Sequence, residues 1–218
     1  IAEHSAKINR RKLTGACAGA WMREGEIVLV NRRSVGFYKS GGEKINNLRE
    51  NSLVFLDSST LKPTREVNLD KKLGYSKDKS HTRFAWHWCW ANWFHAKDLF
   101  LISHGDNKIL SLAEGETGQV VQKCSNFTSC ITAHAISRDE TEIAVATMNE
   151  VVLLESDTLK TKKRIAYLPG IFGSWFCKGA EKAICFIKYS PDNRYIYCTT
   201  RDVNSYSGDK KVIIIDLI

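Results

Sequence analysis

The chain has 218 residues, of which 43% are hydrophobic and 26% are charged, and its formal net charge is +8. This length and composition are typical of a soluble globular protein with one sizeable core. No run of about 18 apolar residues occurs, which excludes a membrane-spanning helix. The positive charge favours partners that are acidic.

Four segments along the chain repeat one pattern: a hydrophobic strand, a polar turn and a second hydrophobic strand. Their sequences are GAWMREGEIVLV, ANWFHAKDLFLI, HAISRDETEIAV and IKYSPDNRYIYC. Superposing the turns aligns Trp21, Trp93, Ile136 and Tyr189, at intervals of 72, 43 and 53 residues. A unit of roughly 40 residues with variable insertions is typical of the blades of a β-propeller.

Each segment continues into a third strand, and in the first three a turn around Thr60, Thr117 or Thr158 leads into a fourth strand. Four short antiparallel strands make one propeller blade. We therefore predict an all-β fold, a single propeller region over residues 1–218 with an outer strand of a preceding or closing blade in 1–14. The predicted blades cover approximately 15–69, 84–124, 128–167 and 182–218.

At this point the chain resembles the WD-repeat family. The nearest match is the fourth unit, GAEKAICFIKYSPDNRYIYCTTRD, in which Gly179 takes the glycine position of the family's Gly-His pair and Ile184 follows at the family spacing. The repeats are degenerate, since Ala180 stands in the place of His and Ile215-Asp216 replaces Trp-Asp. The resemblance implies a propeller fold and a role in binding other proteins.

The phase of the repeats predicts that the chain is part of a longer propeller. Residues 6–13 read as an outer strand of a preceding blade, and Leu217-Ile218 directly follow the third strand of the fourth unit. Four blades lie at the lower limit for closed propellers. The alternative is a small ring in which the N-terminal strand pairs beside Val212–Asp216 and leaves no exposed sheet edge.

The seven cysteines are odd in number and form no CxxC pair, which favours free thiols in a reducing compartment, the cytoplasm or the nucleus. We expect no metal site, because equivalent positions on neighbouring blades lie about 10 Å apart whereas zinc needs sulfurs at about 2.3 Å. The motifs GxGxxG, GxxxxGKS/T, HExxH and GxSxG are missing, so we expect no cofactor and no catalytic residues.

One segment, FAWHWCWANWF, keeps a propeller enzyme open as a third hypothesis. It places His87 and Cys89 among tryptophans, and His134 lies on the corresponding strand of the third unit. The strand period of two puts the tryptophans at 86, 88 and 90 on one face and His87 with Cys89 on the other, as expected for a strand covered on both sides. Since no third group would orient a nucleophile, packing is the favoured interpretation.

The long insertions carry most of the charge. Residues 31–50, 70–83, 168–181 and 201–211 carry net charges of +3, +3, 0 and +1, which is +7 of the formal +8. In WD-like propellers, connections of these two kinds (second to third strand, and outer to next inner strand) emerge on one face, the top. Long loops on a rigid scaffold commonly bind ligands.

We therefore predict a non-enzymatic scaffold that binds an acidic or phosphorylated protein segment on a basic and aromatic top face. The alternative is binding of nucleic acid or of anionic lipid headgroups through the same loops. The candidate partner-binding residues are Arg32, Arg33, Lys39, Lys44, Lys71, Lys72, Lys77, Lys79, Arg83, Phe172, Trp175, Phe176, Arg201, Lys210 and Lys211.

Overall fold

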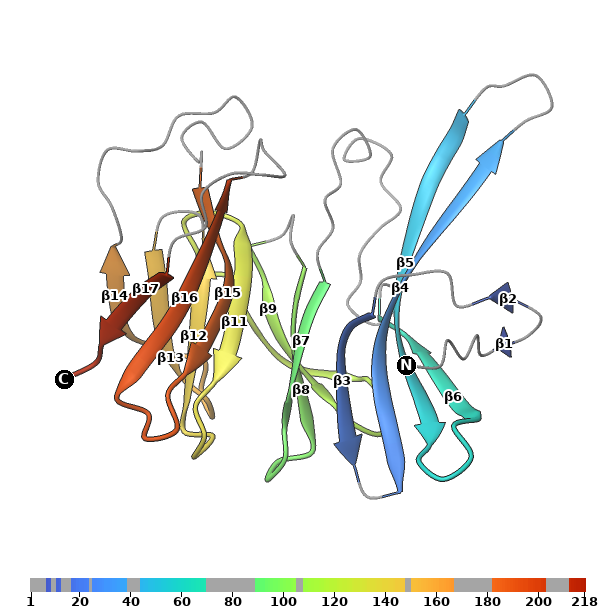
Figure 1. The fold of residues 1–218 in the computed structure, drawn as a ribbon, viewed down its shortest axis with the longest axis horizontal. Helices are drawn as coiled ribbons and strands as arrows, with labels where there is room; N and C mark the ends of the chain where they lie inside the picture. Colours follow the sequence, from blue (N-terminus) through green and yellow to red (C-terminus); the bar gives the residue numbers. More distant parts are fainter. Residues whose placement is uncertain are drawn as a thin grey trace.

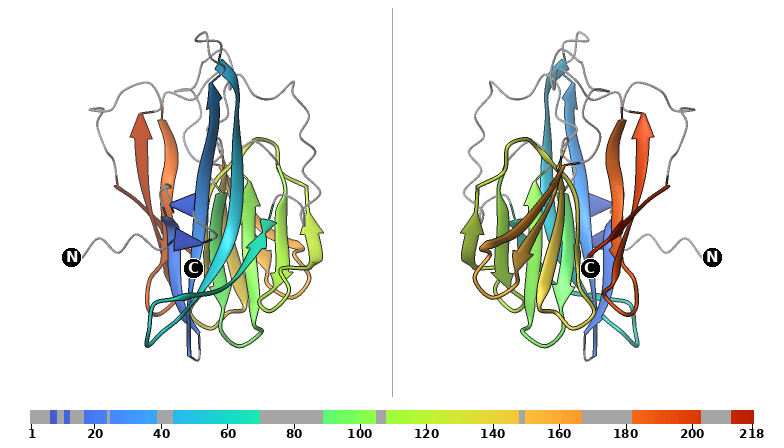
Figure 2. Two further views of the ribbon diagram at one scale, coloured as in Figure 1. Left: turned by 90° about the vertical axis from the view of Figure 1, so that its right-hand side faces the viewer. Right: turned by 90° about the vertical axis from the view of Figure 1, so that its left-hand side faces the viewer.

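The computed structural model describes residues 7–8, 11–12, 17–23, 25–38, 44–69, 89–104, 108–147, 150–166, 182–202 and 212–218. The secondary-structure elements in these ranges are β-strands, so the all-β prediction is confirmed. Four antiparallel sheets follow one another along the chain and stand side by side in an open arc (Figure 1). In the two end-on views, the fourth sheet stands on one side of the first sheet and the second sheet on the other (Figure 2).

Within each sheet the strands keep their order along the chain, and each strand pairs with the next. The first sheet contains β3 (Cys17–Arg23), β4 (Glu26–Tyr38), β5 (Lys44–Asp57) and β6 (Pro63–Asn68). The second contains β7 (Cys89–Phe94), β8 (Leu99–His104), β9 (Leu110–Glu114) and β10 (Val120–Cys124).

The third sheet contains β11 (Ile131–Ile136), β12 (Glu142–Thr147), β13 (Glu150–Glu155) and β14 (Thr161–Ala166). The fourth sheet consists, among the described residues, of β15 (Lys182–Tyr189), β16 (Tyr195–Asp202) and β17 (Val212–Asp216). Consecutive strands with alternating hydrophobic residues and tight turns produce this meander, because antiparallel neighbours need only a short connection.

The N-terminal stretch does not form one outer strand in the described residues. Strand β1 (Lys7–Ile8) pairs with β2 (Arg11–Lys12) in a small sheet of their own. The pairing of residues 6–13 with β17, which would close a four-bladed ring, is not among the described pairings. The fourth sheet therefore ends at β17 in the part of the chain that the structure describes.

Three hydrophobic clusters fill the spaces between successive sheets. The first joins Val28, Leu53 and Phe55 of the first sheet to Trp93 and Phe100 of the second. The second cluster joins the second and third sheets, and the third cluster joins the third and fourth sheets. Each inner sheet is thus buried on both faces, which explains why its strands are apolar on both sides. We call the side of a sheet that faces the next sheet its forward face.

The sequence alignment of the four units is one residue out in the first unit. Met22 pairs with Ile27, the residue after Glu26, and Glu26 pairs with Asp57 of the third strand. Ile136 and Tyr189 hold the same position in the third and fourth sheets. The cause is a shorter first turn, in which Arg23 pairs with Glu26. Because neighbouring residues in a strand point to opposite sides, the one-residue error would exchange the two faces of the first sheet.

The insertion 31–50, expected as a loop, is mostly a β-hairpin. Strands β4 and β5 run on for 13 and 14 residues and stay paired as far as Tyr38 and Lys44. The hairpin extends beyond the ends of the other sheets (Figure 1). Both arms contain β-branched or aromatic residues, such as Val35, Phe37 and Ile45, and continued pairing satisfies their backbone groups.

Candidate interaction faces

The short turns of all four sheets lie along one edge of the arc, the lower edge in Figure 1, which we call the turn face. In each sheet, an amide in the turn after the third strand donates to a carbonyl in the turn between the first two strands, at 2.8 to 3.1 Å. This contact joins the two turns of each sheet. The four donor and acceptor pairs are Ser58 and Gly25, Gly115 and Asp98, Ser156 and Thr141, and Leu217 and Arg194.

The turns after the third strand share one side-chain hydrogen bond, from a threonine hydroxyl to an acidic residue three positions earlier. Thr60 Oγ1 donates to Asp57 Oδ1 at 2.8 Å. The hydroxyls of Thr117 and Thr158 donate in the same way to Glu114 and Glu155, both at 2.7 Å. In the first of these turns, hydrogen bonds from the Ser59 hydroxyl, the Thr60 amide and the Thr60 hydroxyl lower the pKa of Asp57 to about 2. The acidic residue and the threonine noted in the sequence therefore fix a turn.

The turns between the first two strands of the third and fourth sheets are also alike. Ser137 Oγ donates to Asp139 Oδ1 at 2.7 Å, and Ser190 Oγ donates to Asp192 Oδ1 at 2.5 Å. The serine hydroxyls hold the pKa of both carboxyl groups below the usual range. These aspartates are turn formers, as the sequence indicated, and Oδ1 of each accepts hydrogen bonds from its own turn.

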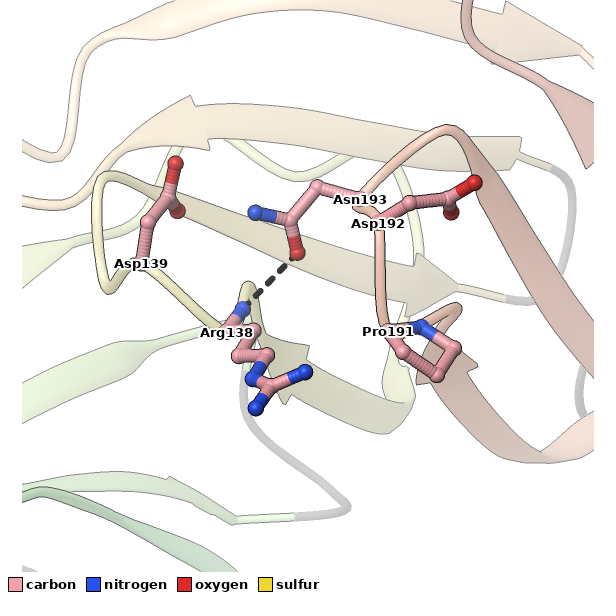
Figure 3. A pocket seen from close by; sticks show the side chains of 5 residues that line it. All are labelled: Arg138, Asp139, Pro191, Asp192 and Asn193. Atoms are coloured by element: carbon pink, nitrogen blue, oxygen red, sulfur yellow. Dashed lines mark hydrogen bonds between the residues drawn. The ribbon is translucent and has the colours of Figure 1, made fainter.

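Neighbouring sheets are linked across the turn face at equivalent positions. Glu140 accepts hydrogen bonds from the amides of His95 and Ala96 of the second sheet, at 2.6 and 3.0 Å. Asn193, at the corresponding place in the fourth sheet, accepts from the amide of Arg138 at 2.9 Å (Figure 3). Sequence reasoning missed both links, although each residue lies four positions after the aligned Ile136 or Tyr189.

A shallow hollow opens on the turn face between the third and fourth sheets. It is lined by Arg138, Asp139, Pro191, Asp192 and Asn193 (Figure 3). The two carboxylates point away from each other and bind their own turns, so the hollow offers no pair of converging acidic groups. No group of three or more possible metal ligands occurs in the described parts of the chain.

The turn face is acidic. Six of its turns, 57–62, 95–98, 114–119, 137–142, 155–160 and 190–194, contain ten acidic and five basic residues, for a net charge of −5. The acidic residues are Asp57, Asp98, Glu114, Glu116, Asp139, Glu140, Glu142, Glu155, Asp157 and Asp192, and the basic ones are Lys62, Lys97, Arg138, Lys160 and Arg194. Several form ion pairs there, such as Lys97 with Asp157 at 2.5 Å and Lys162 of β14 with Glu142 at 2.7 Å.

We call the opposite edge of the arc the loop face, because the strands next to the four insertions end there. The strands that enter or flank the insertions end or begin there, at Tyr38 and Lys44, Asn68 and Cys89, Ala166 and Lys182, and Asp202 and Val212. Since antiparallel strands that turn at one end must reconnect at the other, these connections leave on the side away from the turn face.

Only a few predicted binding residues lie in the described strands. Arg32 and Arg33 belong to β4, Lys44 begins β5 and Arg201 belongs to β16. In the backbone register, Arg33 pairs with Glu50 and Arg201 with Ala183. The remaining predicted residues lie outside the described residues: Lys39, Lys71, Lys72, Lys77, Lys79, Arg83, Phe172, Trp175, Phe176, Lys210 and Lys211. The binding site therefore stays a prediction.

His134 of β11, one of the residues of the enzyme hypothesis, is buried beside β7. His134 is 5% exposed, and the Asn92 amide nitrogen lies 2.8 Å from both its Nδ1 atom and its carbonyl oxygen. Because a carbonyl only accepts, the amide nitrogen must face it, and Nδ1 then accepts the second hydrogen. His134 thus joins two inner strands. His87 lies outside the described residues, and Cys89 begins β7.

The four cysteines whose side chains are described, Cys124, Cys130, Cys185 and Cys198, are free thiols. Burial raises the pKa of Cys198 to about 12, so it is a packing residue with little thiolate character at neutral pH. Among the described residues, no helix has the length and apolar character needed to cross a membrane.

The comparisons with known proteins show the fold. No protein-family model and no curated protein sequence matches the chain. A structure of Kuenenia stuttgartiensis hydrazine synthase is similar over 83% of this chain and 49% of its own, with a TM-score of 0.54 and 14% identity. A mitotic checkpoint complex structure is similar over 88% of this chain and 44% of its own, with a TM-score of 0.51 and 7% identity.

A third similar structure is the β-propeller domain of Cps50 (Swd1) from Myceliophteria thermophila, with a TM-score of 0.40 and 13% identity over 56% of this chain and 38% of that one. The chain spans about half or less of the length of each structure. The arc of antiparallel sheets is the arrangement of part of a β-propeller, the fold that the resemblance to the WD-repeat family implied.

Proposed function

We propose that the chain is a non-enzymatic interaction scaffold of the cytoplasm or nucleus whose loop face binds an acidic or phosphorylated protein segment. The observation that carries the proposal is the separation of charge. The insertions that connect strands at the loop face carry +7, whereas the six turns counted on the turn face carry −5. A basic end attracts an acidic segment, and an acidic opposite end orients it during approach.

The rigidity of the turn face supports this division of roles. Backbone and side-chain bonds join turns within each sheet and between sheets, and an engaged surface of this kind has few free groups to offer. The buried His134 and the unreactive Cys198 give no support to catalysis in the described strands.

A peptide-binding measurement tests the proposal. We expect labelled acidic and phosphorylated peptides to bind the 218-residue protein above scrambled and basic peptides in fluorescence anisotropy. Reversing Arg32, Arg33 and Lys44 to glutamate should weaken binding at least tenfold, because three charges on one end change sign. The matched control reverses three exposed basic residues of the turn face, Lys62, Lys160 and Arg194, and should change binding less than twofold. Equal binding of acidic and scrambled peptides would contradict the proposal.

The alternative partners are nucleic acid and anionic lipid headgroups, which the same positive charge favours. Their signature is a steep loss of affinity between low and physiological salt that is independent of peptide sequence. Binding of single-stranded DNA or of vesicles containing phosphatidylserine, with no preference among peptides, would favour this alternative.

A further inference from the structure

The hairpin of β4 and β5 is two-stranded over its outer half. Among the described strands, β3 pairs with β4 only as far as Asn31, and β6 pairs with β5 only as far as Ser52. Beyond these residues β4 and β5 continue to pair with each other. This outer half rises past the ends of the other sheets (Figure 1). It is a projecting ribbon, and its two faces can be followed in the register.

The forward face of the ribbon is basic. Residues that pair across two strands share a face, and successive pairs alternate between the two faces. Because Val28 and Phe55 pair on the forward face, every second pair beyond them lies on that face too. These pairs contain three basic residues and no acidic residue. They are Arg32 with Asn51, Ser34 with Arg49, Gly36 with Asn47, and Tyr38 with Lys44.

The rear face of the ribbon is mostly apolar and has no net charge. A bulge after Gly36 makes the register skip Asn46, so that Ile45 pairs with Phe37. A bulge can re-aim a residue in this way without ending the pairing of the strands. The two faces therefore stay distinct to the end of the ribbon. The rear pairs are Arg33 with Glu50, Val35 with Leu48, and Phe37 with Ile45.

The register divides the basic residues of this insertion between the two faces. Arg33, one of the predicted binding residues, lies on the rear face opposite Glu50. Arg49, which was not among the predicted residues, lies on the forward face with Arg32 and Lys44. Opposite charges in a direct cross-strand pair attract each other. Arg33 thus has a counter-charge within the ribbon, whereas the three forward residues have no acidic residue opposite them.

We propose, building on the function proposed above, that the forward face of the ribbon binds an extended acidic segment of a partner protein through Arg32, Arg49 and Lys44. Residues on one face of a strand recur at every second position, about 6.6–6.8 Å apart. An extended segment that lies along the ribbon has the same repeat. The acidic residues of the partner should therefore occupy alternate positions rather than one uninterrupted block.

A nucleic acid is a poorer occupant of this face. Proteins that bind DNA through its backbone make on the order of 6–10 phosphate contacts. The forward face has three basic residues, and the pair of Gly36 with Asn47 interrupts them with an uncharged row. A nucleic acid backbone carries a charge at every nucleotide, whereas an acidic peptide can carry a neutral residue at the uncharged row. The pattern therefore favours a peptide.

Two labelled peptides of one composition test the spacing in fluorescence anisotropy with the 218-residue protein. One peptide alternates four glutamates with four serines, and the other has its four glutamates in a block. When extended, the first has all four carboxylates on one side, and the second has two on each side. We expect the alternating peptide to bind about fivefold more tightly, because two further exposed charge pairs can form, each of them weak.

Single substitutions test which face binds. Arg32→Gln and Arg33→Gln remove the same charge at adjacent positions, so they are matched in net charge and differ in face. Arg32→Gln and Arg49→Gln should each weaken binding of the alternating peptide about threefold, and Arg33→Gln less than about 1.5-fold. Arg32→Lys keeps the charge and should bind within about twofold of the parent chain, which separates loss of charge from disturbance of the strand.

Four outcomes would contradict this assignment. If both glutamate peptides bind equally, and above a basic peptide, the proposed function stands but the extended form of the segment is wrong. Equal losses from Arg32→Gln and Arg33→Gln would show that the forward face is not the binding face. Single-stranded DNA that binds more tightly than either peptide, and is weakened by Arg49→Gln, would assign the face to nucleic acid. Binding of neither peptide would contradict the proposed function as well.

Discussion

The third and fourth sheets share a strand order, a turn chemistry and a register, yet one is covered on both faces and the other on one. Leu153 of the third sheet is 4% exposed, and Ile214 at the equivalent position of the fourth is 61% exposed. Both are aliphatic, so the residue type alone does not reveal which one is buried. Burial in a stacked architecture is decided by the neighbouring sheet, since each unit contacts only the units beside it.

Truncation of these two residues gives the largest expected difference. Leu153→Ala should lower the free energy of unfolding by about 2–4 kcal/mol, because it leaves a cavity between two sheets. Ile214→Ala should lower it by less than about 0.5 kcal/mol, because the side chain is mostly in water already. Urea denaturation of both variants measures the difference. Equal losses would show that the forward face of the fourth sheet is covered in solution.

The second-largest expected effect is loss of the hydrogen bond that Tyr189 makes between the third and fourth sheets. The hydroxyl of Tyr189 donates to Glu142 Oε1 at 2.8 Å, while Lys162 holds the other carboxylate oxygen. Burial, and then Glu142, raise the pKa of Tyr189, so the hydroxyl remains a donor over the working pH range. Tyr189→Phe should lower the free energy of unfolding by about 1.5–3 kcal/mol, as expected for a hydrogen bond to a charged group.

A double-mutant cycle separates this bond from packing. If the hydroxyl acts through Glu142, Tyr189→Phe should cost much less when Glu142→Gln is already present. The same cost in both backgrounds would assign the effect to the ring's surroundings.

The link between the turns of the third and fourth sheets should have a smaller effect. Asn193 combines a positive φ of 59° with a hydrogen bond from the amide of Arg138. Asn193→Gly keeps the backbone conformation and removes the bond, with an expected loss of about 0.5 kcal/mol, whereas Asn193→Ala adds backbone strain and should lose about 1.5 kcal/mol. Thermal unfolding of the two variants would rank them, and the reverse order would contradict this account.

The smallest expected effect is on how the stability of the fold depends on pH under acidic conditions. The folded-state pKa values of Asp139 and Asp192 are lowered by serine hydroxyls, so each carboxylate stabilises the fold above its unfolded pKa near 3.8. This contribution is lost as the pH falls below about 4 towards the folded pKa values. Asp192→Asn should therefore reduce stability at pH 7 but make its decline below pH 4 shallower. Asp139→Asn should behave in the same way, and a difference between them would show that the two turns are not equivalent.

The sequence predicted the parts of the fold that local chemistry determines. Alternating hydrophobic strands and serine-aspartate or acid-threonine turns recur with enough regularity to identify the sheets, since each turn closes through its own side chains. The sequence alignment was wrong at Trp21, because the first turn is shorter than the others and shifts the strand register without changing the pattern of residue types. The insertion 31–50 was mistaken for a loop because its charges concealed two strands that continue β4 and β5.

The candidate site could be predicted only in outline. Sorting the insertions to one end follows from the antiparallel strand order, which the sequence indicates. The links made by Glu140 and Asn193 could not be seen in advance, because they join turns whose spatial proximity depends on how sheets stack. The same limit applies to His134, whose burial beside Asn92 rests on two strands that are 42 residues apart.

The hydrogen bonds that connect the described turns, within one sheet or between adjacent sheets, bear on how the molecule folds. Each sheet closes through contacts between strands that are neighbours in sequence, and each later contact adds one sheet to an existing one. Structure in such a stack forms first where two sheets already support each other and then spreads outward. The second and third sheets, which share the second hydrophobic cluster, should acquire protection earliest during refolding, and β17 should acquire it last.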